Sequence, residues 1–341
     1  MPYYAGVDLG ATNVRAAVAD EDGTLLARAD RATPQGPTGI AVTEAVLDLL
    51  RSVCAAAGVS PEQVRAVGVG AIGPLDLAAG TVEDPANLPD AVGTVPLVGP
   101  IRELVGSERV YLHNDTAAGV VGERFFADRN PDDMVYLTIS SGIGAGVTVD
   151  GHVIGGWDGN AGEVGHMVVD PAGRRTCGCG RDGHWEAYCS GDNVPAYARQ
   201  LHEREGIPTD LPVGEDAGDG GTDVGGGADD GGGLTAADVY GAAGTDPLAD
   251  ALVERTTRWN AIGLTNVVHA YAPIVVYVGG AVAVNNESVV VDPLRERLDE
   301  MVFSNVPDLA LTTLGDDVVL RGAVASALTG GTGDRTRVPT A

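Results

Sequence analysis

The sequence predicts a two-lobed α/β protein. Its 341 residues exceed what one hydrophobic core usually fills, and a hydrophobic content of 44% is typical of a globular chain. Short apolar segments that end in glycine-containing turns alternate with segments whose apolar residues have helical spacing. A strand, turn and strand pattern at the N-terminus returns from residue 134 onward, which indicates two related lobes.

The first part of the chain predicts a meander and then a helix. Residues 3–9 alternate as a strand, and residues 15–18 and 25–31 continue it as antiparallel strands across the turn Asp22-Gly23. Residues 38–57 have the apolar spacing of a helix, whereas 64–69 and 110–113 predict short buried strands. We expect a small N-terminal lobe over residues 1–114, joined by a C-terminal helix within 318–331.

The second part repeats this order. Residues 117–127 predict a helix, 134–149 a strand and hairpin, and 152–154 a further strand. Helices follow at 236–243 and 248–270, a buried strand at 274–278, and a last apolar helix at 322–328. The large lobe is expected over 115–317. Within it, residues 211–233 contain little but Gly, Asp, Glu and small residues, which predicts a solvated acidic insertion.

The charge of the chain excludes some partners. A net charge of −27 repels nucleic acids and acidic membranes. The chain contains no lysine, so that Arg supplies all of its side-chain cations apart from His. This composition favours adaptation to high salt, where self-repulsion is screened. An ordinary acidic protein with a bias toward Arg is the alternative.

The sequence also predicts a cytoplasmic protein. No stretch approaches the roughly 18 to 20 apolar residues that span a bilayer, and residues 1–10 lack the basic and apolar regions of a signal peptide. Four cysteines in a cytosolic chain of this size do not indicate a disulfide framework. Cys54 lies alone in an apolar helical stretch and is expected in the core.

Three predicted strands end in glycine-containing turns. They are Asp8-Leu9-Gly10-Ala11-Thr12-Asn13, Ser140-Ser141-Gly142-Ile143-Gly144-Ala145-Gly146 and Gly279-Gly280. Backbone without side chains can approach a polyphosphate closely while donating N–H groups. A single turn of this kind is more often a tight hairpin, but three of them favour nucleotide binding.

Asp8 precedes the first of these turns. It is a candidate ligand of hydrated Mg²⁺, which keeps most of its waters and takes only one or two carboxylates. An Asp that caps the turn is the alternative. Because the chain has 48 acidic residues, the prediction depends on the position of Asp8 before Gly10 and Thr12, not on its type.

Asn114 and Asp115 stand between a predicted strand and a predicted helix. Residues in this place can act as helix N-caps with no further function. In the functional interpretation, Asp115 accepts the proton of an attacking hydroxyl and Asn114 orients a sugar. A helix N-terminus lowers the basicity of a carboxylate, but phosphoryl transfer needs orientation and late proton acceptance more than a strong base.

The most specific segment runs from Glu163 to Glu186. It contains four nitrogen and sulfur ligands that suit a closed tetrahedral Zn²⁺ site, namely His166, Cys177, Cys179 and His184. The spacing is not that of a zinc finger, and free thiols in a Gly-rich loop are the alternative. A zinc ion would fix a loop that has no core of its own, and would place Glu163 and Glu186 as acceptors for sugar hydroxyls.

With these motifs the chain resembles the ROK family of sugar kinases and repressors, within the actin-like ATPase and hexokinase superfamily. The resemblance covers nearly the whole length and implies a two-lobed actin-like (ribonuclease H-like) ATPase fold, with nucleotide and sugar in the cleft between the lobes. The segments 8–13 and 141–146 look like the family's two phosphate motifs, and 278–280 like its adenosine-side motif. ATP, Mg²⁺ and a structural Zn²⁺ are the implied cofactors.

The resemblance also implies roles for single residues. Asp115 matches the catalytic base, and the matching sugar ligands are Asn87, Asn114, Glu163, His166 and Glu186. The family normally has a third cysteine where this chain has His184, so we expect a site of two His and two Cys, with Cys189 as a substitute if the loop shifts. Ser141 stands in the usual threonine position.

The implied activity is ATP-dependent phosphorylation of the 6-hydroxyl of a hexose, with glucose as the first candidate. Fructokinase, N-acetylmannosamine kinase and allose kinase are alternative activities. ADP and polyphosphate are alternative phosphoryl donors to ATP. A sugar-sensing repressor of the same family is disfavoured, because Asp8 comes too early for a preceding DNA-binding domain and the charge opposes DNA. A homodimer or tetramer is the expected assembly.

Overall fold

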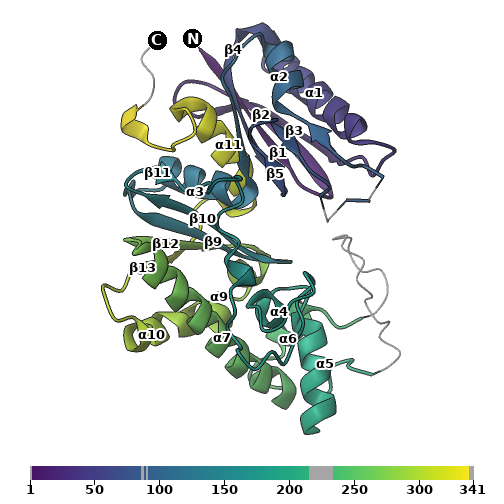
Figure 1. The fold of residues 1–341 in the computed structure, drawn as a ribbon, viewed down its shortest axis with the longest axis vertical. Helices are drawn as coiled ribbons and strands as arrows, with labels where there is room; N and C mark the ends of the chain where they lie inside the picture. Colours follow the sequence, from purple (N-terminus) through teal and green to yellow (C-terminus); the bar gives the residue numbers. More distant parts are fainter. Residues whose placement is uncertain (1, 86–87, 90, 215–232, 338–341) are drawn as a thin grey trace.

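Two five-stranded sheets form the frame of the protein (Figure 1). The computed structural model describes residues 2–85, 88–89, 91–214 and 233–337. The first sheet has the order β3-β2-β1-β4-β8, with β1 Tyr3–Leu9, β2 Asn13–Ala19, β3 Leu25–Ala32, β4 Val64–Ala71 and β8 Val110–Asn114. The second has the order β11-β10-β9-β12-β13, with β9 Met134–Ile139, β10 Ile143–Val149, β11 His152–Val153, β12 Val275–Gly279 and β13 Asp308–Leu311.

The two sheets share one topology. In each, the first three strands form an antiparallel meander, β1 to β3 and β9 to β11. Two further strands then extend the sheet in parallel from its first strand, β4 and β8 in one sheet, β12 and β13 in the other. The repeated pattern predicted from the sequence is therefore present in three dimensions.

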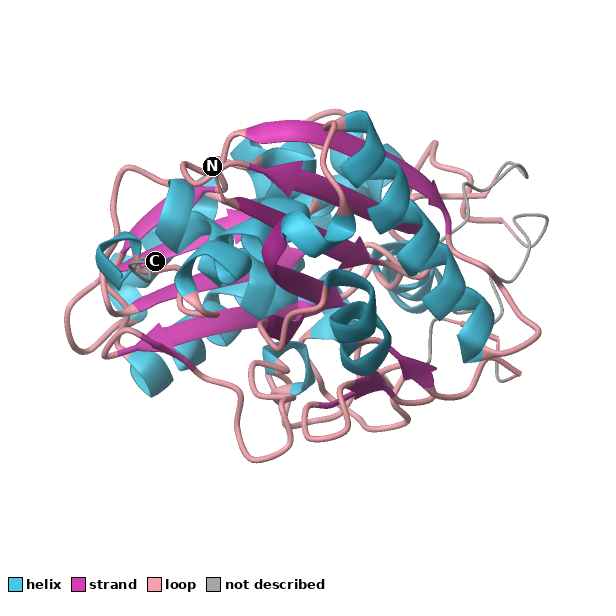
Figure 2. Ribbon diagram, turned by 90° about the horizontal axis from the view of Figure 1, so that it is seen from above, coloured by secondary structure: helices cyan, strands magenta, loops and turns pink. Residues whose placement is uncertain are grey.

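Helices flank the strands of both sheets, as the view from above shows (Figure 2). The first three along the chain are α1 Gly39–Ala56, α2 Val98–Val105 and α3 Asp115–Phe126. The others are α4 Glu186–Cys189, α5 Val194–Glu205, α6 Ala236–Gly241, α7 Pro247–Tyr271, α8 Ala281–Asn285, α9 Glu287–Val290, α10 Asp292–Met301 and α11 Val318–Thr329. A small sheet, β5 Leu75–Asp76, β6 Thr81–Val82 and β7 Val95–Pro96, follows β4.

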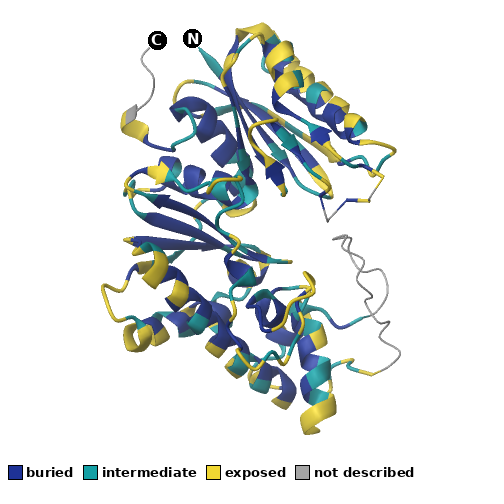
Figure 3. Ribbon diagram, in the orientation of Figure 1, coloured by how far each residue is buried: buried dark blue, intermediate teal, exposed yellow. Residues whose placement is uncertain are grey.

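Local sequence explains where the longest helix begins and ends. Asp246 caps the N-terminus of α7 by accepting hydrogen bonds from the backbone N–H groups of Leu248 and Ala249, and Pro247 stands at the first helical position. Ala272 ends the helix in a left-handed conformation at φ 46°. In α1, apolar residues at helical spacing face the first sheet while the opposite side is exposed (Figure 3).

Some elements are absent from the sequence prediction. It contains none at 194–205 or between 281 and 311, where the structure has α5, α8, α9, α10 and β13. The last helix starts at Val318, where the joining helix 318–331 was expected to begin and four residues before the predicted apolar stretch 322–328. The earlier start follows because the apolar run that includes Leu320 already packs on the first sheet. None of the helices in the described part of the chain combines the length and apolar character needed to span a bilayer.

Helices α3 and α11 lie between the two sheets and cross at glycines. A Cβ atom on Gly322 would lie 1.8 Å from the carbonyl oxygen of Ala118, and one on Gly122 would lie 3.0 Å from the Cα of Gly322. No larger residue fits this crossing without moving the helices apart. The helix that begins with Asp115 is thus packed directly on the helix that covers the first sheet.

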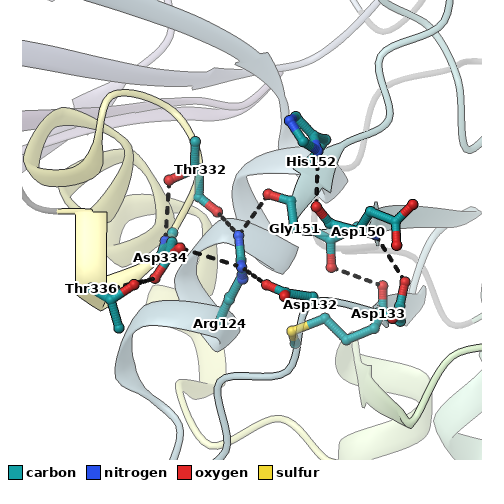
Figure 4. A network of polar contacts seen from close by, with 12 residues as sticks. Arg124, Asp132, Asp133, Asp150, Gly151, His152, Thr332, Asp334 and Thr336 are labelled. Atoms are coloured by element: carbon teal, nitrogen blue, oxygen red, sulfur yellow. Dashed lines mark hydrogen bonds and ion pairs between the residues drawn. The ribbon is translucent and has the colours of Figure 1, made fainter.

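The C-terminal end of α3 is fixed by a buried arginine (Figure 4). Arg124 is 1% exposed, and its guanidinium donates to the carbonyl oxygens of Gly151 at 2.8 Å and Thr332 at 2.9 Å. It also pairs with the carboxylates of Asp132 and Asp334. A buried cation needs such partners to offset its loss of hydration. Arg124 therefore ties α3 to the turn between β10 and β11 and to the chain after α11.

Candidate active site

The first glycine turn joins β1 to β2. The N–H of Gly10 donates to the carbonyl oxygen of Asn13 at 3.0 Å, and the Thr33 hydroxyl donates to the carbonyl oxygen of Gly10 at 2.8 Å. The predicted phosphate-binding residues Gly10, Ala11, Thr12 and Asn13 thus form one tight turn at the end of the first sheet. The N–H of Gly10 closes this turn.

Asp8 lies beside the turn in a partly buried position. Burial raises the pKa of its carboxyl to about 7. The nearby charge of Arg15 lowers the pKa, whereas the charges of Asp115 and Asp317 raise it. The Arg15 guanidinium is 3.6 Å from the Asp8 carboxylate. A carboxylate that is costly to ionise and close to a second acid is a good position for a divalent cation.

Replacement of Asp8 by Asn is expected to stabilise the fold at pH 8. Because the folded pKa is raised above its ordinary value of 3.8, the stability that Asp8 contributes is fully present below that value and is lost as pH rises through about 7. Asp8→Asn should therefore raise Tm by about 2 °C or more at pH 8 and change it little at pH 4. Thermal melts at both pH values measure this, and a lower Tm at pH 8 would contradict the burial argument.

Asn114 and Asp115 occupy the junction of β8 and α3. Asn114 is buried and caps the helix, because its side-chain oxygen accepts hydrogen bonds from the Ala117 N–H at 3.0 Å and the Thr116 hydroxyl at 2.7 Å. Asn114 therefore acts as a helix cap, as the alternative interpretation predicted. Its amide NH₂ can still donate a hydrogen bond to a ligand. Asp115 is the first helical residue and does not act as the cap.

The carboxyl of Asp115 has a raised pKa because it is withdrawn from water, although a hydrogen bond from the Thr116 N–H at 2.7 Å opposes the rise. The charge of Asp115 in turn raises the pKa of Asp8 on the first sheet and of Glu163 beside the second. Asp115 therefore lies within electrostatic reach of both sides of the site.

The second glycine turn joins β9 to β10 and faces Glu186. The N–H of Ile143 donates to a carboxylate oxygen of Glu186 at 2.9 Å, and a Cβ on Gly142 would lie 2.8 Å from that oxygen. A Cβ on Gly144 would lie 3.1 Å from the Thr116 methyl group. Gly142 thus lies beside Glu186 and Gly144 beside the start of α3, while Ser141 precedes Gly142 in the same turn.

The third turn, Gly279-Gly280, ends β12, which is the parallel neighbour of β9. Gly280 has φ +87°, and a Cβ there would lie 2.4 Å from the carbonyl oxygen of Ile139. The second and third turns therefore lie side by side at the carboxyl ends of two parallel strands, the edge at which open α/β sheets bind ligands.

The four predicted zinc ligands come together. One ligand atom from each of His166, Cys177, Cys179 and His184 lies within 4.8 Å of the others. The Cys177 sulfur is 3.7 Å from Nδ1 of His166, and the Cys179 sulfur is 3.3 Å from Nδ1 of His184. Zn–S bonds of about 2.3 Å and Zn–N bonds of about 2.0 Å in a tetrahedron require ligand separations of about 3.3–3.8 Å. The donor set suits a zinc ion, and two of its pairs already have the separation that zinc requires.

His166 joins this cluster to the acidic residues. Its Nδ1 faces Cys177, while its Nε2 is 3.8 Å from a carboxylate oxygen of Glu163. Partial burial raises the pKa of Glu163, the charge of His166 opposes this, and the charges of Asp115 and Glu186 add to the rise. Glu163, His166 and Glu186 therefore converge on the region of Asp115.

Trp185 anchors the loop that carries the four candidate metal ligands. It stands between His184 and Glu186, is fully buried, and donates from Nε1 to the Asn260 side-chain oxygen on α7 at 2.7 Å. Gly263 leaves room for the indole, since a Cβ there would lie 2.3 Å from it. The sequence analysis did not single out this contact, although a Trp between two candidate ligands is a signal for it.

Cys189 does not lie in the metal cluster. It is fully buried in α4, its thiol contacts the Thr256 carbonyl oxygen at 3.5 Å, and burial raises the pKa of the thiol well above its ordinary value. Cys54 lies in the core of the first sheet and α1, as expected. Asn87, the remaining predicted sugar ligand, falls outside the described residues.

Two sheets of one topology, with glycine turns and acids gathered between their ends, define the class of actin-like ATPases. Within it, this chain belongs to the ROK family, whose model matches residues 4–329.

Relatives of known structure and name cover almost the whole chain. A glucokinase of Pyrobaculum calidifontis is 34% identical over 328 residues, which are 96% of this chain and 95% of that protein. The ROK hexokinase of Thermus thermophilus superposes with a TM-score of 0.75 at 30% identity, over 95% of this chain and 97% of that one. A ROK family glucokinase of Streptomyces griseus, solved with glucose and AMPPNP, superposes with a TM-score of 0.69 at 30% identity, over 95% of this chain and 99% of that one.

Proposed function

We propose that the protein is an ATP-dependent glucokinase that phosphorylates the 6-hydroxyl of D-glucose. The observation that carries this proposal is Asp115 at the start of α3, between the first glycine turn with Asp8 on one side and Glu163 with Glu186 on the other. The relatives that are named glucokinases extend over the same residues.

Asp115 acts as the base in this reaction. The sugar 6-oxygen forms a bond to the γ-phosphorus while the bond from that phosphorus to the bridging oxygen of ADP breaks, and the hydroxyl proton passes to Asp115. The raised pKa of Asp115 makes it a better acceptor than an exposed carboxylate. Its fixed place at the first turn of α3 supplies the orientation that this loose transition state requires.

The other residues bind and orient the substrates. Asn114 donates from its amide NH₂ to a sugar hydroxyl, while Glu163, His166 and Glu186 accept from or donate to further hydroxyls. The glycine turns with Ser141 and Gly279 hold the nucleotide phosphates and adenosine. Asp8 would hold a hydrated Mg²⁺, which would supply positive charge beside the phosphates. The two His and two Cys would hold a zinc ion, which would fix the segment between Glu163 and Glu186.

A panel of hexoses tests the proposal. Glucose, fructose, mannose, allose and N-acetylmannosamine would be assayed with ATP, ADP and polyphosphate as donors, in low salt and in molar KCl. We expect the highest kcat/KM for glucose with ATP. A preference for another hexose would correct the substrate, and no phosphorylation of any hexose would overturn the kinase assignment. Homodimer or tetramer assembly and adaptation to high salt stay predictions, which sedimentation and melting in the same two buffers would measure.

A further inference from the structure

The loop that leads into Glu163 reaches across to the first-sheet side of the molecule. The Asn160 side-chain oxygen accepts a hydrogen bond from the backbone N–H of Leu75 in β5 at 3.2 Å. Next to it, Gly159 lies against Leu77, where a Cβ on the glycine would be 2.7 Å from the leucine Cγ. Residues 155–162 follow β11 of the second sheet, so these contacts join the two halves of the frame.

The loop is shaped to hold the Asn160 amide in one orientation. The Asn160 NH₂ donates to the carbonyl oxygen of Asp158 at 3.1 Å, and its backbone N–H donates to the Asp158 carboxylate at 3.1 Å. With the NH₂ used inside the loop, the oxygen is the atom that faces Leu75. Gly156, Gly159 and Gly162 take φ values of 72°, 87° and 103°, which close the loop in a conformation that other residues adopt only with strain.

Both partners of this hydrogen bond lie close in sequence to the candidate active site. Glu163 follows Asn160 by three residues, and the intervening Gly162 is fixed because its carbonyl oxygen accepts from the Ala145 N–H at 2.8 Å. Leu75 follows the end of β4, where the Ile72 N–H donates to the Leu9 carbonyl oxygen at 3.0 Å, beside Asp8. The bond thus connects the segment that enters Glu163 with the segment that leaves the neighbourhood of Asp8.

We propose that Asn160 is a positioning residue that holds the Glu163 side of the sugar site against the first-sheet side and so raises hexose affinity. This inference rests on the proposed function, because it assigns an effect on sugar binding. Asn160 does not contact the sugar. It acts through Leu75 and through the loop. Removal of one neutral hydrogen bond of this kind is expected to weaken hexose binding about 5- to 10-fold.

The test compares three variants by titration calorimetry of the full chain with glucose in the absence of nucleotide. We expect Asn160→Ala to weaken glucose binding about 5- to 10-fold. Asn160→Asp keeps an acceptor for the Leu75 N–H and should bind more tightly than Asn160→Ala. Trp157→Ala is the matched control in the same loop, because Trp157 is 97% exposed, and it should bind glucose as the wild type does.

A second ligand separates sugar-site positioning from general loss of structure. AMPPNP alone should bind wild type and Asn160→Ala equally, because the Asn160 side chain hydrogen-bonds to Leu75 and Asp158 and to no described residue of the glycine turns. Unchanged glucose affinity in Asn160→Ala, an equal loss for glucose and AMPPNP, or an equal loss in Trp157→Ala would each overturn the inference.

Hydrogen exchange at the Leu75 amide gives a readout that needs no sugar. Asn160→Ala should speed this exchange, whereas Trp157→Ala should leave it unchanged. If the wild type binds no hexose, the proposed function is wrong, and the exchange rate still decides whether Asn160 holds the two sides together. Equal exchange in wild type and Asn160→Ala would then show that it does not.

Discussion

Replacement of Asp115 by Asn is expected to lower kcat about 10³-fold and to change glucose affinity only a few-fold. Asn has the same shape, and its side-chain oxygen can still accept the hydrogen bond from the Thr116 N–H that Asp115 accepts at 2.7 Å. It cannot take up the proton of the 6-hydroxyl. The loss therefore falls on the transition state and not on the bound ground state.

Steady-state kinetics and glucose titration of Asp115→Asn measure the two effects separately. Asp128→Asn is the matched control, since Asp128 is an exposed acid just beyond the far end of the same helix and should leave kcat unchanged. A kcat within tenfold of the wild type would rule out Asp115 as the base.

The pH dependence of kcat also tests whether Asp115 is the base. Because burial raises the pKa of Asp115 above its ordinary value of 3.8, the wild-type kcat should fall on acidification at a pH above that value. The charged form is the active one, so that activity is present above the raised pKa and is lost below it. This acidic limb should be absent from the residual activity of Asp115→Asn.

Loss of the metal cluster is the second large effect that we expect. Cys177→Ala should abolish stoichiometric zinc binding and raise the KM for glucose about 10- to 100-fold. The Cys177 sulfur is 3.7 Å from Nδ1 of His166, whose Nε2 is near Glu163, so the predicted metal site and the predicted sugar site share the His166 side chain. The hydrogen bonds within the loop, such as those from the N–H groups of Val169 and Cys177 to Gly183 and Arg181, do not need the ion. We therefore expect loss of the ion to free the His166 side chain and not to unfold the loop.

Cys189→Ala is the matched control, because Cys189 is also a buried cysteine near the loop but contacts Thr256 and not the cluster. Elemental analysis should find about one zinc per chain in the wild type and in Cys189→Ala, and none in Cys177→Ala. Zinc retained in Cys177→Ala, or lost in Cys189→Ala, would show that the ligand set is different.

Much of the fold was accessible from sequence patterns. Strands such as β1 and β12 are short apolar runs that end at glycine, and α1 and α7 have long stretches of helical spacing. The helices and the strand between residues 281 and 311 could not be predicted from the sequence. Its helices are short, and α8 and α9 have too few turns to display a periodicity. The parallel pairing of β13 with β12 follows only from tertiary packing.

The candidate site, like the fold, could be predicted only in part from the sequence. By itself the sequence predicted the chemistry of the site, because the four candidate metal ligands, the three glycine turns and Asp115 occur together in one chain. Only the tertiary structure decided which groups meet. It brought Asp8 near Asp115 from a distant part of the chain, placed Cys189 in the core, and joined Asn160 to Leu75. Short-range patterns record backbone preference and burial, whereas these contacts depend on how the two sheets pack around α3 and α11.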